Sequence, residues 1–93
     1  MRSHKRRLVR FRPVREEQVD DILFLIDQEG KAIHALAPIG AGIWSLLREP
    51  ASIAETTKIL KQAFPAISPT RVACDVEAIF AELQEHGLIR HAG

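Results

Sequence analysis

Four histidines and one cysteine are the side chains of this 93-residue sequence best suited to bind a metal or act as a nucleophile. The histidines are His4, His34, His86 and His91, and the cysteine is Cys74. None of the histidines stands at metal-binding spacing from a second ligand, and Cys74 has no partner cysteine. We therefore predict no metal site and no cofactor. His34 is interpreted as an edge-strand or surface histidine, and His86 as a helix-terminal residue whose positive charge favours the helix dipole.

The surroundings of Cys74 disfavour catalysis. A nucleophilic cysteine needs a base and positively charged neighbours, but Asp75 and Glu77 beside it are acidic. With Glu82 and Glu85, these carboxylates fit the solvated side of a helix better than a catalytic pair. The sequence also contains no phosphate-binding loop, dinucleotide fingerprint or Gly-x-Ser-x-Gly motif. We predict that the chain has no catalytic residues and is not an enzyme.

Length and composition indicate a single domain with its own core. The 93 residues are 46% hydrophobic, and a single cysteine excludes an intrachain disulfide. No apolar run reaches the roughly 18 residues that a membrane-spanning helix needs. No apolar stretch of a secretory signal follows the basic N-terminus. We therefore expect no membrane partner and a cytoplasmic location.

The charge distribution is uneven along the chain. Residues 1–15 carry seven Arg or Lys and no acid, whereas the remainder carries six basic and twelve acidic side chains, a net charge of −6. We interpret residues 1–7 as a flexible basic N-terminus and residues 8–90 as the folded domain. The basic segment is either a solubilising tail or a contact for phosphates, and the sequence leaves both interpretations open.

The hydrophobic pattern of the first half predicts three strands. Residues 8–12 alternate at Val9 and Phe11, residues 22–26 form a continuous apolar run typical of a central strand, and residues 31–36 form the third strand. Residues 27–30 are the predicted turn of a hairpin, with Gly30 free to adopt positive φ. The charged residues 14–20 are predicted to be a loop.

Three helices are predicted in the second half. The first begins at Pro38 and ends before Pro50. The second begins at the capping box of residues 52–55 and places Ile53, Thr57, Leu60 and Phe64 on one apolar stripe. The third begins at residues 68–69, ends at Gly87 and has a core stripe. That stripe consists of Val72, Val76, Ile79, Phe80 and Leu83. The predicted fold class is α+β and winged-helix-like, with a three-stranded antiparallel meander followed by three helices.

The ordered set of these segments resembles the PqqD family. The matching residues are 21–27, 30, 33–36, 40–47, 52–60, 75–83 and 87–89, and the resemblance extends over residues 8–90. It implies a non-catalytic adaptor that recognises the leader of a ribosomally synthesised precursor peptide and presents it to a modifying enzyme. The namesake pathway makes pyrroloquinoline quinone. The implied enzyme partner is a radical S-adenosylmethionine protein, a cyclase or a protease.

The resemblance implies that the leader binds as an added strand beside residues 31–36, in a groove bordered by the third helix. An edge strand offers unpaired backbone N–H and C=O groups, so the chemistry of this segment is compatible with that role. The predicted peptide-binding residues are Lys31, Ala32, Ile33, His34, Ala35, Leu36, Arg71, Val72, Asp75 and Ile79. The same open edge could also pair two copies of the chain, so a homodimer is a further possibility.

The alternative function is a winged-helix DNA-binding regulator. In that fold the third helix would enter the major groove, but it carries only Arg71 against Asp75, Glu77, Glu82 and Glu85. A net negative helix facing phosphates is unfavourable, so the sequence disfavours nucleic acid as the partner.

Overall fold

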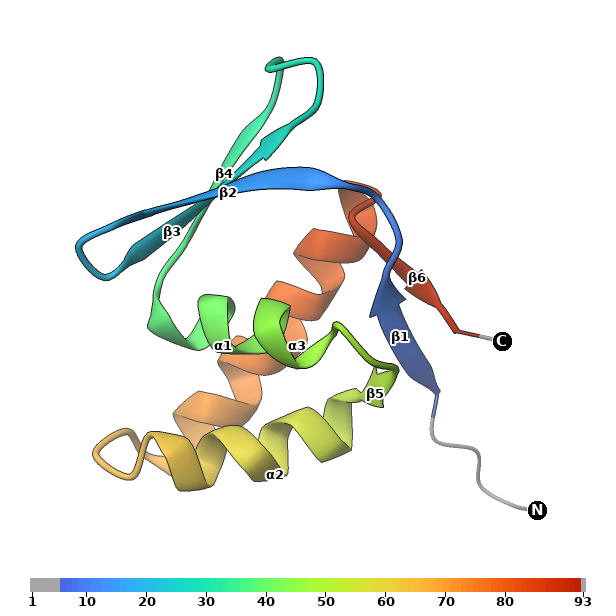
Figure 1. The fold of residues 1–93 in the computed structure, drawn as a ribbon. Coiled ribbons are helices and arrows are strands. Elements are labelled where there is room, and N and C mark those ends of the chain that lie inside the picture. Colours follow the sequence, from blue (N-terminus) through green and yellow to red (C-terminus); the bar gives the residue numbers. More distant parts are fainter. Residues whose placement is uncertain (1–5, 93) are drawn as a thin grey trace.

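The computed structural model describes residues 6–92 and has an α+β architecture with two small sheets and three helices (Figure 1). The elements are β1 (Arg7–Arg10), β2 (Val14–Val19), β3 (Ile22–Asp27), β4 (Ile33–Leu36), α1 (Pro38–Leu46), β5 (Ala51–Ser52), α2 (Ile53–Ala63), α3 (Pro69–Glu85) and β6 (Ile89–His91). The predicted fold class, a three-stranded antiparallel meander with three helices, is confirmed.

The first strand of the meander is not the predicted one, residues 8–12. The meander is β2–β3–β4, so residues 14–19 form a strand rather than the predicted loop. These residues are too polar to suggest a strand, but β3 supplies partners for their backbone groups from Val14 opposite Asp27 to Val19 opposite Ile22. Asp20 closes the connection with a φ of 55°. The apolar run of residues 22–26 is the central strand, as predicted.

The N-terminal strand joins a second sheet. β1 lies between β5 and β6 and is antiparallel to both, so segments from the two ends of the sequence lie side by side (Figure 1). The predicted apolar positions, Val9 and Phe11, are not the buried ones: Leu8 is buried, whereas Phe11 is 42% exposed. Within the predicted N-terminal segment 1–7, Arg7 begins β1, and residues 1–5 lie outside the described residues.

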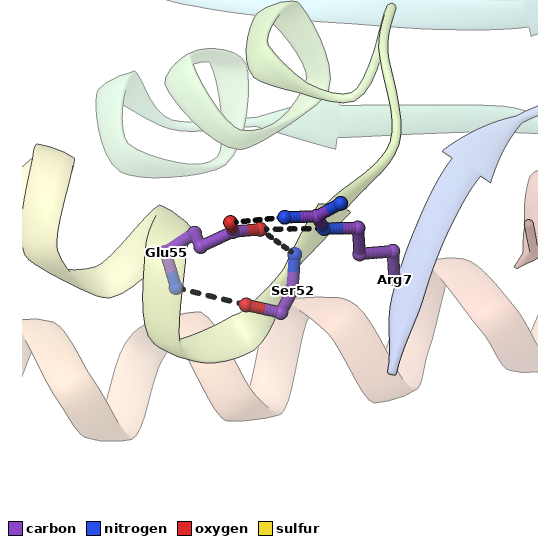
Figure 2. Close-up of polar contacts among 3 residues, drawn as sticks. All are labelled: Arg7, Ser52 and Glu55. Atoms are coloured by element: carbon purple, nitrogen blue, oxygen red, sulfur yellow. Dashed lines mark hydrogen bonds and ion pairs between the residues drawn. The ribbon is translucent and has the colours of Figure 1, made fainter. Parts of the chain in front are cut away.

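The predicted start of α1 at Pro38 is confirmed, and those of α2 and α3 are confirmed together with their capping hydrogen bonds. The Ser52 hydroxyl accepts from the Glu55 backbone N–H, and the Glu55 carboxylate accepts from the Ser52 N–H, which completes the capping box of α2 (Figure 2). Ser68 caps α3 through the Arg71 N–H. At the other end of α3, Gly87 has a φ of 72°, and the Leu88 N–H donates to the Leu83 carbonyl.

The helices and the inner face of the meander enclose one core. The α3 stripe is confirmed, with Val72, Val76, Phe80 and Leu83 buried and Ile79 half-buried. The predicted α2 stripe is confirmed at Leu60, which is buried, and at Phe64, which is half-buried against the core. It is wrong at Ile53, which is 37% exposed, and Thr56 rather than Thr57 is the fully buried threonine. The pairing of β5 with β1 places Ser52 inside at 3% exposure, and this rotates the first turn of α2 so that Ile53 points outward.

A polar junction ties the two sheets together. The Trp44 Nε1–H and the Arg10 guanidinium both donate to Oε2 of Glu16, at 2.9 and 3.0 Å. Arg10 also lies 4.4 Å over the Trp44 ring, and burial lowers the pKa of its guanidinium. Glu16 is in β2 and Arg10 in β1, so this carboxylate connects the meander to the second sheet and to α1.

Candidate functional site

The free edge of β4 is the feature on which the predicted site depends. Within residues 6–92, β4 pairs only with β3, so its other edge has no strand beside it. The predicted strand of residues 31–36 is shorter in the structure, because it begins at Ile33. Lys31 and Ala32 belong to the turn, where the Lys31 N–H donates to the Asp27 side chain and the Ala32 carbonyl accepts from the Asp27 N–H. The predicted edge position of this segment is correct.

The register shows which backbone groups of β4 face outward. The Asp27 N–H donates to the Ala32 carbonyl at 3.1 Å, so these two residues form a hydrogen-bonded pair. Such pairs alternate along antiparallel strands, and the pairing of Leu25 with His34 and Leu23 with Leu36 continues the series. His34 and Leu36 therefore direct their backbone groups to β3. Ile33 and Ala35 direct theirs to the open edge.

The two faces of β4 have different surroundings. His34 and Leu36 share the inner face with the buried residues Leu25 and Leu23, whereas Ile33 and Ala35 point to the outer face. Ile33 is 62% exposed, which makes it the most exposed large hydrophobic residue in the described chain. A strand added at this edge would place alternate side chains against the inner rim and against this apolar outer face.

The C-terminal half of α3 forms the inner rim beside β4. The rings of His34 in β4 and His86 at the end of α3 have centroids 4.5 Å apart. Two residues beyond His34 in β4, Leu36 packs closely against Gly40 of α1, which also lies near Ile79 of α3. A Cβ at Gly40 would lie 3.2 Å from Leu36 Cβ and 3.6 Å from Ile79 Cδ1. Sequence reasoning did not assign His86 or Gly40 to the site. The available signal was the position of Gly40 in the first turn of α1, where glycine is unfavourable without a packing reason.

The predicted α3 residues have unequal access to a peptide. Arg71, Asp75 and Ile79 follow one another at intervals of four residues and so share a face, and Arg71 and Asp75 form an ion pair at 3.4 Å. Ile79 is half-buried beside Gly40. Val72 is completely buried, so in this structure it belongs to the core and presents no surface to a peptide.

The best-formed hollows of the described surface lie away from β4. Among residues 6–92 they measure about 350 to 710 Å³, and none of them is lined by β4, so the groove expected beside residues 31–36 is not one of these hollows. In the same residues no three His, Cys, Asp or Glu side chains gather where they could hold a metal ion. No helix in this part of the chain is both long and apolar enough to span a bilayer.

The fold and the open strand edge define a class of small α+β domains, and comparison with known proteins identifies the family. The family model described as coenzyme PQQ synthesis protein D (PqqD) matches residues 23–89. The chain therefore belongs to the PqqD family. This match includes β3 from its second residue, β4 and all three helices, and so contains both β4 and α3, the two elements of the candidate site.

A solved structure supports the same fold. The structure of TbiB1 in complex with the TbiA(beta) leader peptide superposes with a TM-score of 0.69 at 22% sequence identity, covering 91% of this chain and 98% of TbiB1. At this identity the likeness establishes the fold alone. A search of curated proteins gave no significant match to the sequence.

Proposed function

We propose that this chain is a non-catalytic adaptor that binds the leader of a ribosomally synthesised precursor peptide by strand addition at β4 and presents it to a modifying enzyme. The observation that carries the proposal is the outward direction of the Ile33 and Ala35 backbone groups at an edge that no other described strand covers. Membership of the PqqD family and the leader-bound state of the structural neighbour TbiB1 support it.

Backbone pairing would provide affinity, and the two faces of β4 would provide selectivity. The inner rim of His34, Leu36, Ile79 and His86 offers aromatic and aliphatic contacts, and the outer face offers Ile33. The enzyme partner would be a radical S-adenosylmethionine protein, a cyclase or a protease. A homodimer formed through two β4 edges would compete with the peptide, because it would use the same backbone groups.

Proline substitution at the open edge tests strand addition. Linear peptides selected from a phage-displayed random library serve as the probe, and their affinity is measured by fluorescence anisotropy. Ala35→Pro removes an outward N–H without breaking the β3–β4 ladder, so we expect the protein to fold and the affinity to fall at least about tenfold. If a folded Ala35→Pro protein bound the peptides as tightly as the wild type, strand addition at β4 would be wrong.

Gln18→Pro is the matched control. The β2–β3 pairing directs the Gln18 backbone groups to the opposite edge of the same sheet, so this proline removes an outward N–H far from β4. We expect unchanged peptide affinity. Hydrogen exchange provides a second readout: bound peptide should protect the amides of Ile33 and Ala35 and leave that of Gln18 unprotected.

A DNA-binding function receives less support from the charges of α3. Arg71 is already paired with Asp75, and the exposed acids Glu77, Glu82 and Glu85 face solvent on the same helix. Phosphates would meet net negative charge there.

A further inference from the structure

A basic surface with an aromatic centre lies at the corner between β1 and β2. Phe11 is 42% exposed, and its ring has the Arg90 guanidinium carbon 4.9 Å from its centroid and that of Arg12 at 5.8 Å. Val9 pairs with Arg90, so Phe11, two residues beyond Val9, shares a face with Arg90. We refer to Phe11, Arg12 and Arg90 as the Phe11 patch.

The two arginines of the Phe11 patch have unused charge. Elsewhere in the molecule Arg7 pairs with Glu55, and Arg10 pairs with Glu16. Within residues 6–92, neither Arg12 nor Arg90 has a carboxylate within 4.0 Å. The hydrogen bond from Arg12 Nε to the Gly87 carbonyl at 3.2 Å restrains Arg12, and the position of each guanidinium over the Phe11 ring restrains both arginines. Groups ordered in advance lose less conformational entropy when a ligand binds.

A short chain of contacts links the Phe11 patch to β4. Arg12 bonds to Gly87, the neighbouring residue His86 contacts His34, and His34 lies in β4. Figure 1 shows the β1–β2 corner next to the C-terminal end of α3. A polypeptide paired with β4 lies on the opposite side of the meander from β2, so only a flanking segment that passes along His34 and His86 would reach Arg12.

We infer that the Phe11 patch binds aspartate or glutamate side chains in the segment of the bound peptide that flanks its added strand. This inference rests on the proposed function and adds the chemical class of the ligand: an extended apolar segment with acidic residues at one end. Arginine suits this role because its planar fork binds carboxylates with two hydrogen bonds. The acidic residues Glu82 and Glu85 in the last turns of α3 favour a short acidic segment over the continuous charge of a nucleic acid.

Selection from random peptides tests the inference without the natural leader. The wild type and the Arg12→Gln/Arg90→Gln variant are each used to select from the same phage-displayed random library. We expect Asp and Glu to be enriched on one side of the apolar segment in peptides selected by the wild type, and this enrichment to be lost with the variant. Equal acidic content in both pools would overturn the inference.

Matched peptides give the quantitative test. One peptide selected by the wild type is synthesised with its acids and again with the corresponding amides. We expect the amide form to bind the wild type about three- to tenfold more weakly, and the arginine variant to bind both forms equally. Lys58→Gln/Lys61→Gln removes two charges from α2 and should preserve the wild-type difference. The single variant Arg90→Gln keeps the Arg12–Gly87 hydrogen bond, so it is measured as well in case the double variant does not fold.

The outcomes separate this inference from the proposed function. If Ala35→Pro abolishes binding of both peptide forms but the arginine variants change neither, strand addition stands and the Phe11 patch has no role in it. If Ala35→Pro has no effect, the proposed function itself fails. If a fluorescein-labelled DNA duplex binds the wild type tightly and loses affinity in the arginine variant, the patch is a nucleic-acid contact and the inference is overturned.

Discussion

The edge strands β5 and β4, one from each three-stranded sheet, differ in how their backbone groups are used. In the β5–β1–β6 sheet, the edge strand β5 continues directly into α2, and the Ser52 N–H is used by the Glu55 carboxylate at 2.9 Å. The same carboxylate accepts two hydrogen bonds from Arg7 in β1, at 2.7 and 3.2 Å (Figure 2). The chain therefore engages this edge with its own groups.

The β4 edge of the meander has no such arrangement. Ala37 follows β4 as the N-cap of α1, and it offers no side chain to cap the helix or reach back to the strand. Ile33 and Ala35 keep their outward backbone groups free of any described strand. The two edges therefore differ at the residues that follow them: Glu55, three residues after β5, accepts the Ser52 N–H, whereas Ala37 after β4 has no group that could do the same.

Replacing Leu25 should have the largest effect on the meander. Leu25 is completely buried beneath the centre of the sheet, so Leu25→Ala should lower the free energy of unfolding by about 2–5 kcal/mol in urea denaturation. Ile33→Ala, on the exposed outer face, should change it by about 0.5 kcal/mol or less. Similar losses for both variants would mean that the outer face of β4 is covered and that Ile33 is not available to a ligand.

Glu16→Gln should have an intermediate effect, because it breaks the junction between the two sheets. The substitution removes the charged acceptor of Trp44 Nε1–H and leaves the Arg10 guanidinium, two of whose nitrogens are buried without a partner, without its ion pair. We expect a loss of about 1.5–3 kcal/mol in the free energy of unfolding. Glu17→Gln, the neighbouring exposed position on the other face of β2, is the control and should lose about 0.5 kcal/mol or less. Equal losses would show that the sheets are not coupled through Glu16.

The ion pair of the second sheet should have the smallest effect at neutral pH, and its contribution should depend on pH. The hydrogen bond from Arg7, with a further one from the Ser52 N–H, lowers the pKa of Glu55 from 4.5 to about 2. The stabilisation is therefore fully present above pH 4.5 and is lost as the pH falls towards about 2. Glu55→Gln should flatten the fall in stability across this window.

Urea denaturation at several pH values measures this dependence. Glu77→Gln removes an exposed carboxylate that forms no ion pair within residues 6–92, and it serves as the control for a general loss of negative charge. If Glu55→Gln and Glu77→Gln had the same pH dependence, the edge of the second sheet would not be held by this carboxylate.

Local signals predicted the parts of the fold that depend on neighbours in sequence. The caps at Ser52 and Ser68, the stop at Gly87 and the apolar run of β3 all rely on residues a few positions apart, and the structure has each of them. β2 was missed because its residues are almost entirely polar, and its strand conformation depends on pairing with β3.

The candidate site also has features that the sequence indicated and features that only the structure shows. Sequence reasoning, aided by the family resemblance, located β4 as an edge and the α3 face of Asp75 and Ile79. It did not indicate that His34 would meet His86, or that Arg12 would bond to Gly87, because 52 and 75 residues respectively separate these partners.

The sequence by itself determined where helices begin and end, which strand is most apolar and which segment could remain an edge. Those features follow from backbone preferences and from hydrogen bonds between residues within a few positions of each other. Only the tertiary structure decided that β1 belongs to a separate sheet, that a charged segment becomes β2, and that the end of α3 joins β4 to the Phe11 patch. Strand pairing and side-chain contact between distant segments depend on the packing of the whole chain, which no local pattern specifies.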